Sequence, residues 1–263
     1  MNVQIKKAVK AGNSSAVVLP RAWLNKEVRV ELVKKTPEII LIDTINLIKD
    51  YIDMAEVIGI YLTGSYAREE EDVESDIDVL VITENIDREA INEGIYNILI
   101  ISESLLKQKL ERDLLPVGAM INEAKSLLNL KYLKSIDIKV SKNNIKSYID
   151  STKEKLDLIK KVISELLIQN KKYVPDKMVY TILLRIRTLH IIEGLIRDKI
   201  YSKREFVRLI RSISKGNISY ERYLAIKNNL NEKAVTPLNE IERLTIYLEE
   251  QLKKIEGLVK GLD

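Results

Sequence analysis

Two short polar motifs hold the residues best suited to do chemistry. The first is Gly64-Ser65, and the second is Asp76-Ile77-Asp78. Glycine lets a backbone approach a phosphate closely, and unpaired N–H groups at a helix start favour an anion. Two carboxylates that flank one strand residue point to the same face, and they repel each other unless a cation lies between them. Mg²⁺ prefers carboxylate oxygens together with substrate phosphates, so the motifs predict phosphoryl or nucleotidyl transfer.

Apolar runs beside these motifs predict the strands that position them. One run, at residues 57–62, precedes the glycine, and another, at 79–82, follows the second aspartate. Short apolar runs bounded by turn residues are typical of buried strands. Gly64 is therefore expected where a strand ends and a short helix begins. The acidic run at residues 69–72 is expected to be a solvated loop.

The combined pattern G-S-x-A-R, then S-D-I-D, resembles the minimal nucleotidyltransferases of the polymerase-beta-like superfamily over roughly residues 44–140. The resemblance implies that Gly64 and Ser65 hold a triphosphate and that Arg68 lies near the phosphates. It implies that Asp76 and Asp78 are catalytic and bind the metal ions. An NTP, with ATP expected, is the implied substrate, and Mg²⁺ is the implied cofactor.

The third carboxylate of that family is missing from its expected place. The resemblance implies a carboxylate on the next strand, acting as base toward the attacking hydroxyl, but the strand expected at 95–101 carries Asn97 there. An amide can bind a metal, yet it cannot accept a proton as a carboxylate does. Glu93 and Glu103 are the nearest alternatives, with Glu93 better in register. Nucleotide binding is therefore expected, and transfer is expected to be slow or absent.

The remaining pattern of residues 44–140 predicts an alternating α/β unit with a mixed sheet. Thr44 is expected to cap a helix reaching residue 55, and Asp87 to cap a helix at 88–92. A helix at 105–112 is expected to start at Ser102 or Ser104. Pro116 is expected to start another helix that extends to residue 128.

Residues 1–43 predict a small basic β module. It holds eight basic residues against four acidic ones, an excess equal to the net charge of +4 of the whole chain. A helical turn is expected at 21–24, and a unit of this size buries too little surface to be stable alone. The β-prone runs lie at residues 3–5, 16–19, 28–33 and 39–42.

The run K-A-G-N-S-S-A-V-V-L-P, from Lys10 to Pro20, resembles the SpoVT/AbrB swapped-hairpin fold and its MazE-type antitoxins. In that family two copies interlock into a dimeric barrel and basic residues grip DNA. The resemblance therefore implies a homodimer with a salt-sensitive DNA-binding surface. The alternative is a module that serves only dimerisation or docking, and both remain open. The residues implied to face DNA phosphates are Lys6, Lys7, Lys10, Asn13, Ser14 and Arg21.

From residue 143 onward the pattern predicts helices without strands, packed as a four- or five-helix bundle. The expected helices lie at residues 144–170, 175–199, 203–214, 219–230 and 236–260. The predicted fold class is thus multidomain α+β. The three predicted domains are the β module at 1–43, the nucleotidyltransferase domain at 44–140 and the helical bundle at 141–263.

This domain order resembles the nucleotidyltransferase–HEPN pairing and the helical half of aminoglycoside nucleotidyltransferases. HEPN ribonucleases carry an arginine, four to six residues and then a histidine, a spacing that Arg185 and His190 fit. A spacing of five places two side chains about 140° apart around a helix. His190 also lies on an apolar stripe, which favours a histidine packed at the edge of the core.

Composition restricts the class and the compartment. The chain has 263 residues and 46% hydrophobic content, enough for one large domain or a few small ones. It has no cysteine, which excludes disulfides and thiolate metal sites and fits the cytoplasm. A polar turn follows the first lysines, so we expect no signal peptide, and no apolar stretch is long enough to predict a membrane span.

Two functions of different classes follow. The leading hypothesis is Mg²⁺-dependent transfer of a nucleoside monophosphate from an NTP to a hydroxyl acceptor. The alternative is a DNA-binding regulator or antitoxin-like protein whose nucleotidyltransferase domain only binds nucleotide. A further rival, in which the bundle cuts RNA, requires Arg185 and His190 to converge.

Overall fold

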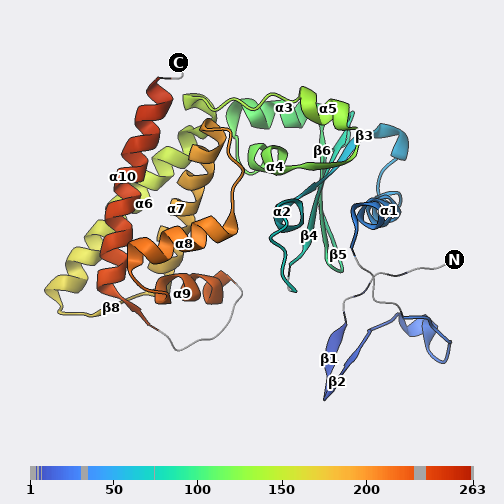
Figure 1. The fold of residues 1–263 in the computed structure, drawn as a ribbon, viewed down its shortest axis with the longest axis horizontal. Coiled ribbons are helices and arrows are strands. Elements are labelled where there is room, and N and C mark those ends of the chain that lie inside the picture. Colours follow the sequence, from blue (N-terminus) through green and yellow to red (C-terminus); the bar gives the residue numbers. More distant parts are fainter. Residues whose placement is uncertain are drawn as a thin grey trace. The chain divides into compact units, whose positions relative to one another are not determined.

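A computed structural model of the chain shows two compact units (Figure 1). The sheet unit comprises Met1–Leu106 and Glu123–Ile136, and the helical unit comprises Lys107–Asn122 and Asp137–Asp263. The three-domain division at residues 43 and 140 stays a prediction. The structure describes residues 4, 6, 8–30, 35–73, 75–227 and 235–261.

A five-stranded mixed sheet forms the body of the sheet unit. The order across the sheet is β5-β6-β4-β3-β7. Strands β4 and β6 run parallel, and the other neighbouring pairs run antiparallel. The strands predicted at 57–62, 79–82 and 95–101 are confirmed. The strands are β3 (Val57–Thr63), β4 (Ile77–Thr83), β5 (Arg88–Glu93), β6 (Tyr96–Ser102) and β7 (Lys125–Leu128).

Strand β4 is buried on both faces, which explains its unbroken apolar run. Val79 and Val81 lie on one face and Leu80 and Ile82 on the other, and all four side chains are 0% exposed. Val79 and Val81 belong to the same core cluster as Ile40 of helix α1, which spans Pro37–Ile48. A fully buried side chain of this size contributes about 1.5–3 kcal/mol to folding. The burial of β4 therefore fixes the position of the residues at its start, Ile77 and Asp78.

Helix α1 (Pro37–Ile48) begins well before the predicted cap. The Oγ1 of Thr36 accepts the backbone N–H of Ile39 at 3.4 Å, and Pro37 is the first helical residue. Thr44 instead lies buried inside the helix, where its hydroxyl donates to the Ile40 carbonyl at 2.7 Å. The strand expected at 39–42 and the cap at Thr44 were therefore wrong. A threonine followed by proline is a strong helix start, which the β-prone isoleucines obscured.

Residues 88–92 form strand β5 rather than the predicted helix. Gly94, at φ +63°, makes the turn that lets β5 pair antiparallel with β6. Asp87 caps no helix, because its Oδ1 accepts the backbone N–H of Ser102 at 2.6 Å. Residues 88–92 have only a weak local helix propensity, and pairing with β6 favours the strand instead.

The helix predicted from Pro116 to residue 128 is shorter in the structure. Helix α4 spans Val117–Glu123, and Lys125–Leu128 forms strand β7, which pairs with β3. Asn129, at φ +64°, then caps the short helix α5 (Leu130–Ser135) through its side chain. Ser102, one of the two predicted starts, does open α3 (Glu103–Arg112), because its Oγ accepts the Leu105 N–H at 3.1 Å.

The N-terminal residues form a small exposed hairpin. Strands β1 (Val9–Ala11) and β2 (Ser14–Ala16) pair around Gly12, and a 3-10 turn, η1 (Arg21–Trp23), follows as predicted. Both strands are exposed along their whole length. Residues 28–30 adopt no strand, contrary to expectation, and residues 3, 5 and 31–33 of the predicted runs lie outside the described residues.

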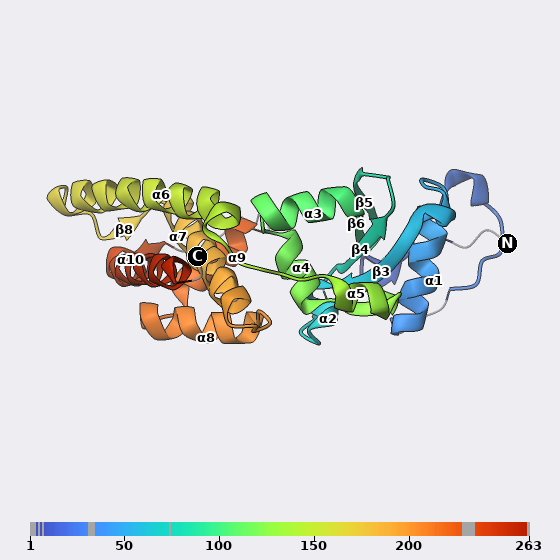
Figure 2. The ribbon, with the colours of Figure 1, turned by 90° about the horizontal axis from the view of Figure 1, so that it is seen from above.

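The helical unit confirms the predicted bundle closely. Helices α6, α7 and α10 lie side by side, with α8 and α9 beside them (Figure 2). Two-residue strands, β8 (Tyr173–Val174) and β9 (Thr236–Pro237), pair where no strand was expected. Among the described residues, none of the helices has the length and apolar character to cross a membrane. The bundle helices are α6 (Lys142–Ile168), α7 (Asp176–Ile196), α8 (Lys203–Ser214), α9 (Ile218–Lys227) and α10 (Leu238–Lys260).

Candidate active site

Gly64 lies where β3 ends and the one-turn helix α2 (Gly64–Ala67) begins, as predicted. Its φ of +69° is in the left-handed region that favours glycine. A Cβ placed on Gly64 would lie 2.1 Å from Oδ2 of Asp78. The antiparallel register, which pairs Thr63 with Asp78, brings this turn against the aspartate. The two polar motifs therefore meet at one point.

Gly64→Ala should lower the free energy of unfolding by about 2 kcal/mol or more, because left-handed backbone strain of about 1–2 kcal/mol adds to the clash with Asp78. Gly12→Ala is the matched control, since Gly12 has φ +62° but no atom within 4 Å of its Cβ position. Denaturant unfolding of the two variants measures the difference. Equal losses of stability would show that Gly64 is not pressed against Asp78.

Asp76 and Asp78 flank Ile77, the fully buried first residue of β4. Asp76 is exposed and Asp78 is half-buried. The hydroxyl of Thr63 donates to the Asp78 backbone carbonyl at 3.2 Å, which fixes this end of the strand. The core thus holds Ile77 inward and leaves the two flanking carboxylates on the opposite face, at the N-terminal end of the central strand β4.

Asn97 lies directly beside Asp78 on the parallel strand β6, where the third carboxylate was sought. Its Nδ2 donates to Oδ1 of Asp78 at 3.0 Å. Glu93 pairs with Tyr96 in the sheet register, and its carboxylate lies 3.6 Å from Lys6 Nζ. Glu103 follows the far end of β6 and accepts from the Tyr132 hydroxyl at 3.1 Å. The position facing Asp78 is therefore filled by an amide.

Glu123, at the end of α4, is a residue of this site that the sequence did not indicate. Its Oε1 accepts the backbone N–H of Gly64 at 2.7 Å, and its Oε2 accepts Nη1 of Arg68 at 2.5 Å. Burial raises the pKa of the Glu123 carboxyl, a shift opposed by Arg68 and reinforced by the charge of Asp78. No local pattern signals this role, because the contact joins residues far apart in the chain.

Arg68 is held by two carboxylates. Besides Glu123, it donates through Nε to Oε2 of Glu70 at 3.2 Å, and the Glu70 side chain is only 7% exposed. The expectation that the acidic run is a solvated loop was therefore wrong for Glu70. It holds for Glu69, which is exposed and pairs with Lys125.

The charges around this turn favour a cation. Three carboxylates, those of Asp78, Glu70 and Glu123, lie around this turn together with the guanidinium of Arg68. Within the described part of the chain, no group of three or more His, Cys, Asp or Glu side chains could hold a metal ion by itself. Mg²⁺ commonly uses one or two carboxylates plus substrate phosphates, so the donor set of Asp76 and Asp78 fits that ion.

The other candidate residues lie elsewhere. Arg185 donates through Nη1 to Ser151 Oγ of α6 at 2.9 Å, whereas His190 packs against Tyr201 and Phe206, with ring centroids 6.0 and 5.9 Å away. Burial lowers the pKa of His190, in keeping with a histidine at the core edge. The two side chains therefore contact different helices.

The predicted DNA-facing residues are exposed where they are described, and Lys7 lies outside the described residues. The exposed residues of this set are Lys6, Lys10, Asn13, Ser14 and Arg21.

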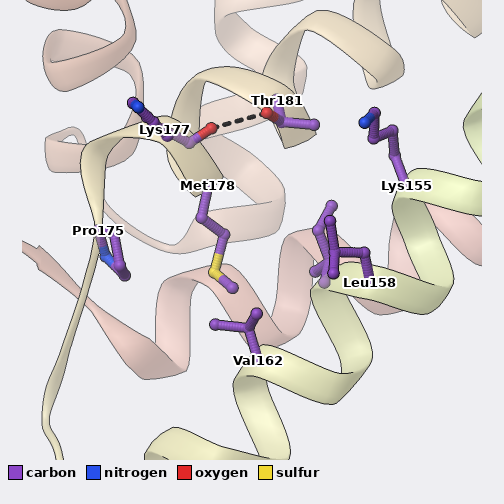
Figure 3. Close-up of a pocket in the computed structure, with 8 residues that line it drawn as sticks. Lys155, Leu158, Val162, Pro175, Lys177, Met178 and Thr181 are labelled. Carbon is purple, nitrogen blue, oxygen red and sulfur yellow. Dashed lines mark hydrogen bonds between the residues drawn. The ribbon is translucent and has the colours of Figure 1, made fainter.

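A shallow pocket of about 250 Å³ lies in the helical unit between α6 and α7 (Figure 3). Apolar side chains such as Leu158, Val162 and Met178 line it, with Lys155 and Lys177 at its border. Its lining residues include no carboxylate or histidine, so it lacks groups for metal-dependent transfer.

Comparison with known proteins places the chain in a family. Residues 45–207 match the profile of the nucleotidyltransferase domain, and the chain therefore belongs to the nucleotidyltransferase domain family. No curated protein matches the chain.

Two solved structures are similar to the chain. One is a nucleotidyltransferase-like protein from Exiguobacterium sibiricum, which is 12% identical in sequence. The match covers 82% of this chain and 75% of that protein, with a TM-score of 0.37. The other is a spectinomycin adenyltransferase from Enterococcus faecialis with ATP and spectinomycin, which is 16% identical in sequence. The match covers 81% of this chain and 99% of that protein, with a TM-score of 0.40.

Proposed function

We propose that this protein binds an NTP, with ATP expected, together with Mg²⁺, and transfers a nucleoside monophosphate to a hydroxyl acceptor. The observation that carries the proposal is the close approach of Gly64 and Asp78, whose Oδ2 lies only 2.1 Å from where a Cβ of residue 64 would be. A turn able to approach phosphates thus abuts a carboxylate able to hold Mg²⁺. Membership of the nucleotidyltransferase domain family supports the reaction class.

Each residue has a role in this proposal. Gly64 and Ser65 contact the triphosphate, and Asp76 and Asp78 hold Mg²⁺. The bound ion would neutralise the charge that develops on the leaving pyrophosphate. In the reaction the acceptor oxygen bonds to the α-phosphorus, the α–β phosphate bond breaks and the acceptor proton is released. Arg68 lies near the phosphates. Its ion pairs with Glu70 and Glu123 hold the turn in place.

The amide of Asn97 leads us to expect a slow rate of nucleotidyl transfer. It steadies Asp78 through its amide hydrogen bond but has no carboxylate to accept the acceptor proton. The transfer test is incubation with α-labelled ATP, Mg²⁺ and candidate acceptors, namely protein, RNA and small hydroxyl compounds. Label that moves to one of them supports the transferase. Tight Mg²⁺-dependent binding without transfer would support a nucleotide sensor instead.

The sensor is the second candidate, and the exposed hairpin favours it. Lys6, Lys10 and Arg21 are exposed, and so are apolar side chains such as Val18 and Leu24, at 67% and 72%. Such a segment suits both DNA phosphates and pairing with a second copy of the chain. In this second proposal the protein is a homodimeric DNA-binding regulator that responds to nucleotide.

The DNA-binding proposal makes a salt-dependence prediction. Affinity for duplex DNA should fall with salt by a log–log slope of about −0.9 for each phosphate contacted. Replacing Lys6, Lys10 and Arg21 with glutamine should flatten that slope by about 0.9 for each phosphate that the variant no longer neutralises. Fluorescence anisotropy at several salt concentrations measures it.

Deletion of residues 1–30 is the control for that prediction, because it leaves the Thr36 cap and the 2.7 Å Lys35–Asp43 ion pair in place. DNA binding that survives both changes would contradict the hairpin's role. Sedimentation of the same deletion tests the homodimer, which should dissociate.

A further inference from the structure

The strongest unexplained feature of the sheet unit is the double contact of Glu123. One carboxylate oxygen accepts Gly64 N–H at 2.7 Å and the other accepts Arg68 Nη1 at 2.5 Å. The Glu123 side chain is only 9% exposed, so these contacts are shielded from water. Charge-assisted hydrogen bonds of this kind are about twice as strong as neutral ones.

Gly64 cannot shift without affecting Asp78. Its left-handed backbone places it so close to Oδ2 of Asp78 that no side chain fits between them. Whatever holds the Gly64 N–H therefore also sets the distance between the turn and the carboxylate. That N–H is held by Glu123, and the Asp78 carboxylate is steadied from the other side by Asn97.

Only an ionised carboxylate of this length satisfies both donors. Each of its oxygens accepts one N–H, from the backbone and from the guanidinium. A glutamine has one acceptor oxygen and an NH₂ group, so it can accept from one donor while its NH₂ faces the other. An aspartate keeps the charge but lacks the reach.

We propose that Glu123 is a positioning residue, which holds the Gly64 turn at a fixed distance from the metal-binding carboxylate of Asp78. The proposal rests on the proposed function in assigning Asp78 to the metal. Glu123 itself contacts neither metal nor nucleotide. It acts through Gly64, so its loss displaces the turn from Asp78 and weakens the site without removing any ligand.

The test compares three full-length variants by Mn²⁺ affinity, measured by electron paramagnetic resonance without nucleotide. Glu123→Gln and Glu123→Asp should each weaken Mn²⁺ binding by about 10–100-fold, as removal of a supporting contact commonly does. Glu69→Gln is the matched control, since it removes one charge from the same loop, where the exposed Glu69 carboxylate pairs with Lys125. It should weaken binding by less than about threefold, because a solvent-exposed charge interacts weakly with its neighbours.

The amide resonance of Gly64 gives a readout that needs no metal. Its proton should shift and exchange faster in Glu123→Asp, and stay unchanged in Glu69→Gln. Equal effects of Glu123→Gln and Glu69→Gln on Mn²⁺ binding, or an unchanged Gly64 resonance in Glu123→Asp, would overturn the proposal. A wild type that binds no Mn²⁺ would refute the proposed metal site, while the resonance would still decide whether Glu123 holds the turn.

Discussion

Asn97→Asp should raise the rate of nucleotidyl transfer by about 10²–10⁴-fold, the usual contribution of a positioned general base. The substitution places a carboxylate beside Asp78, at the point where the amide now donates at 3.0 Å. Two facing carboxylates repel each other, so the variant should be less stable without Mg²⁺ and recover stability when Mg²⁺ is added. Transfer of label from α-labelled ATP and thermal unfolding with and without Mg²⁺ measure both effects.

Asn92→Asp is the matched control for this gain. Asn92 is the register partner of Asn97 on β5 and is exposed, so the same change of charge is made one strand farther from Asp78. It should leave transfer and Mg²⁺ dependence near the wild-type values. A brisk wild type that Asn97→Asp slows would mean that another residue is the base.

Replacing both Asp76 and Asp78 with asparagine should weaken NTP binding in the presence of Mg²⁺ by about 10³-fold, or roughly 4 kcal/mol. The variant should remain folded, because removing two like charges at the start of β4 relieves repulsion and leaves Ile77 buried. Isothermal titration calorimetry with ATP, with and without Mg²⁺, measures the change.

Asp137→Asn provides the comparison for the double variant, since Asp137 is exposed and pairs only with Lys139 in the described part of the chain. The control should bind like the wild type. If the double variant also kept its Mg²⁺-dependent affinity, Asp76 and Asp78 would not be the metal ligands.

The sequence predicted the parts of the site that depend on local pattern. An apolar run, a glycine and a pair of aspartates placed Gly64 at the end of β3 and Asp78 at the start of β4. The third strand was predicted well enough to place Asn97 beside Asp78. The bundle helices were also found, because their apolar stripes are long and their ends carry turn residues.

The sequence could not predict what depends on distant contacts. Residues 88–92 and 125–128 became strands because a neighbouring strand was free to pair with them, which local propensity does not register. Glu123 could not be foreseen, because its two partners are a backbone N–H and a guanidinium of a distant turn. The Thr36–Pro37 start of α1 was present in the sequence, and β-prone isoleucines masked it.

A crystal structure of the full chain with Mg²⁺ and a non-hydrolysable ATP analogue tests the proposed site most directly. We expect Mg²⁺ at about 2.1 Å from carboxylate oxygens of both Asp76 and Asp78, the separation that this ion requires. We also expect the triphosphate to contact Gly64 and Ser65, with Glu123 still bound to the Gly64 N–H. A nucleotide bound away from this turn, or a metal ion that touches neither aspartate, would contradict the proposed site.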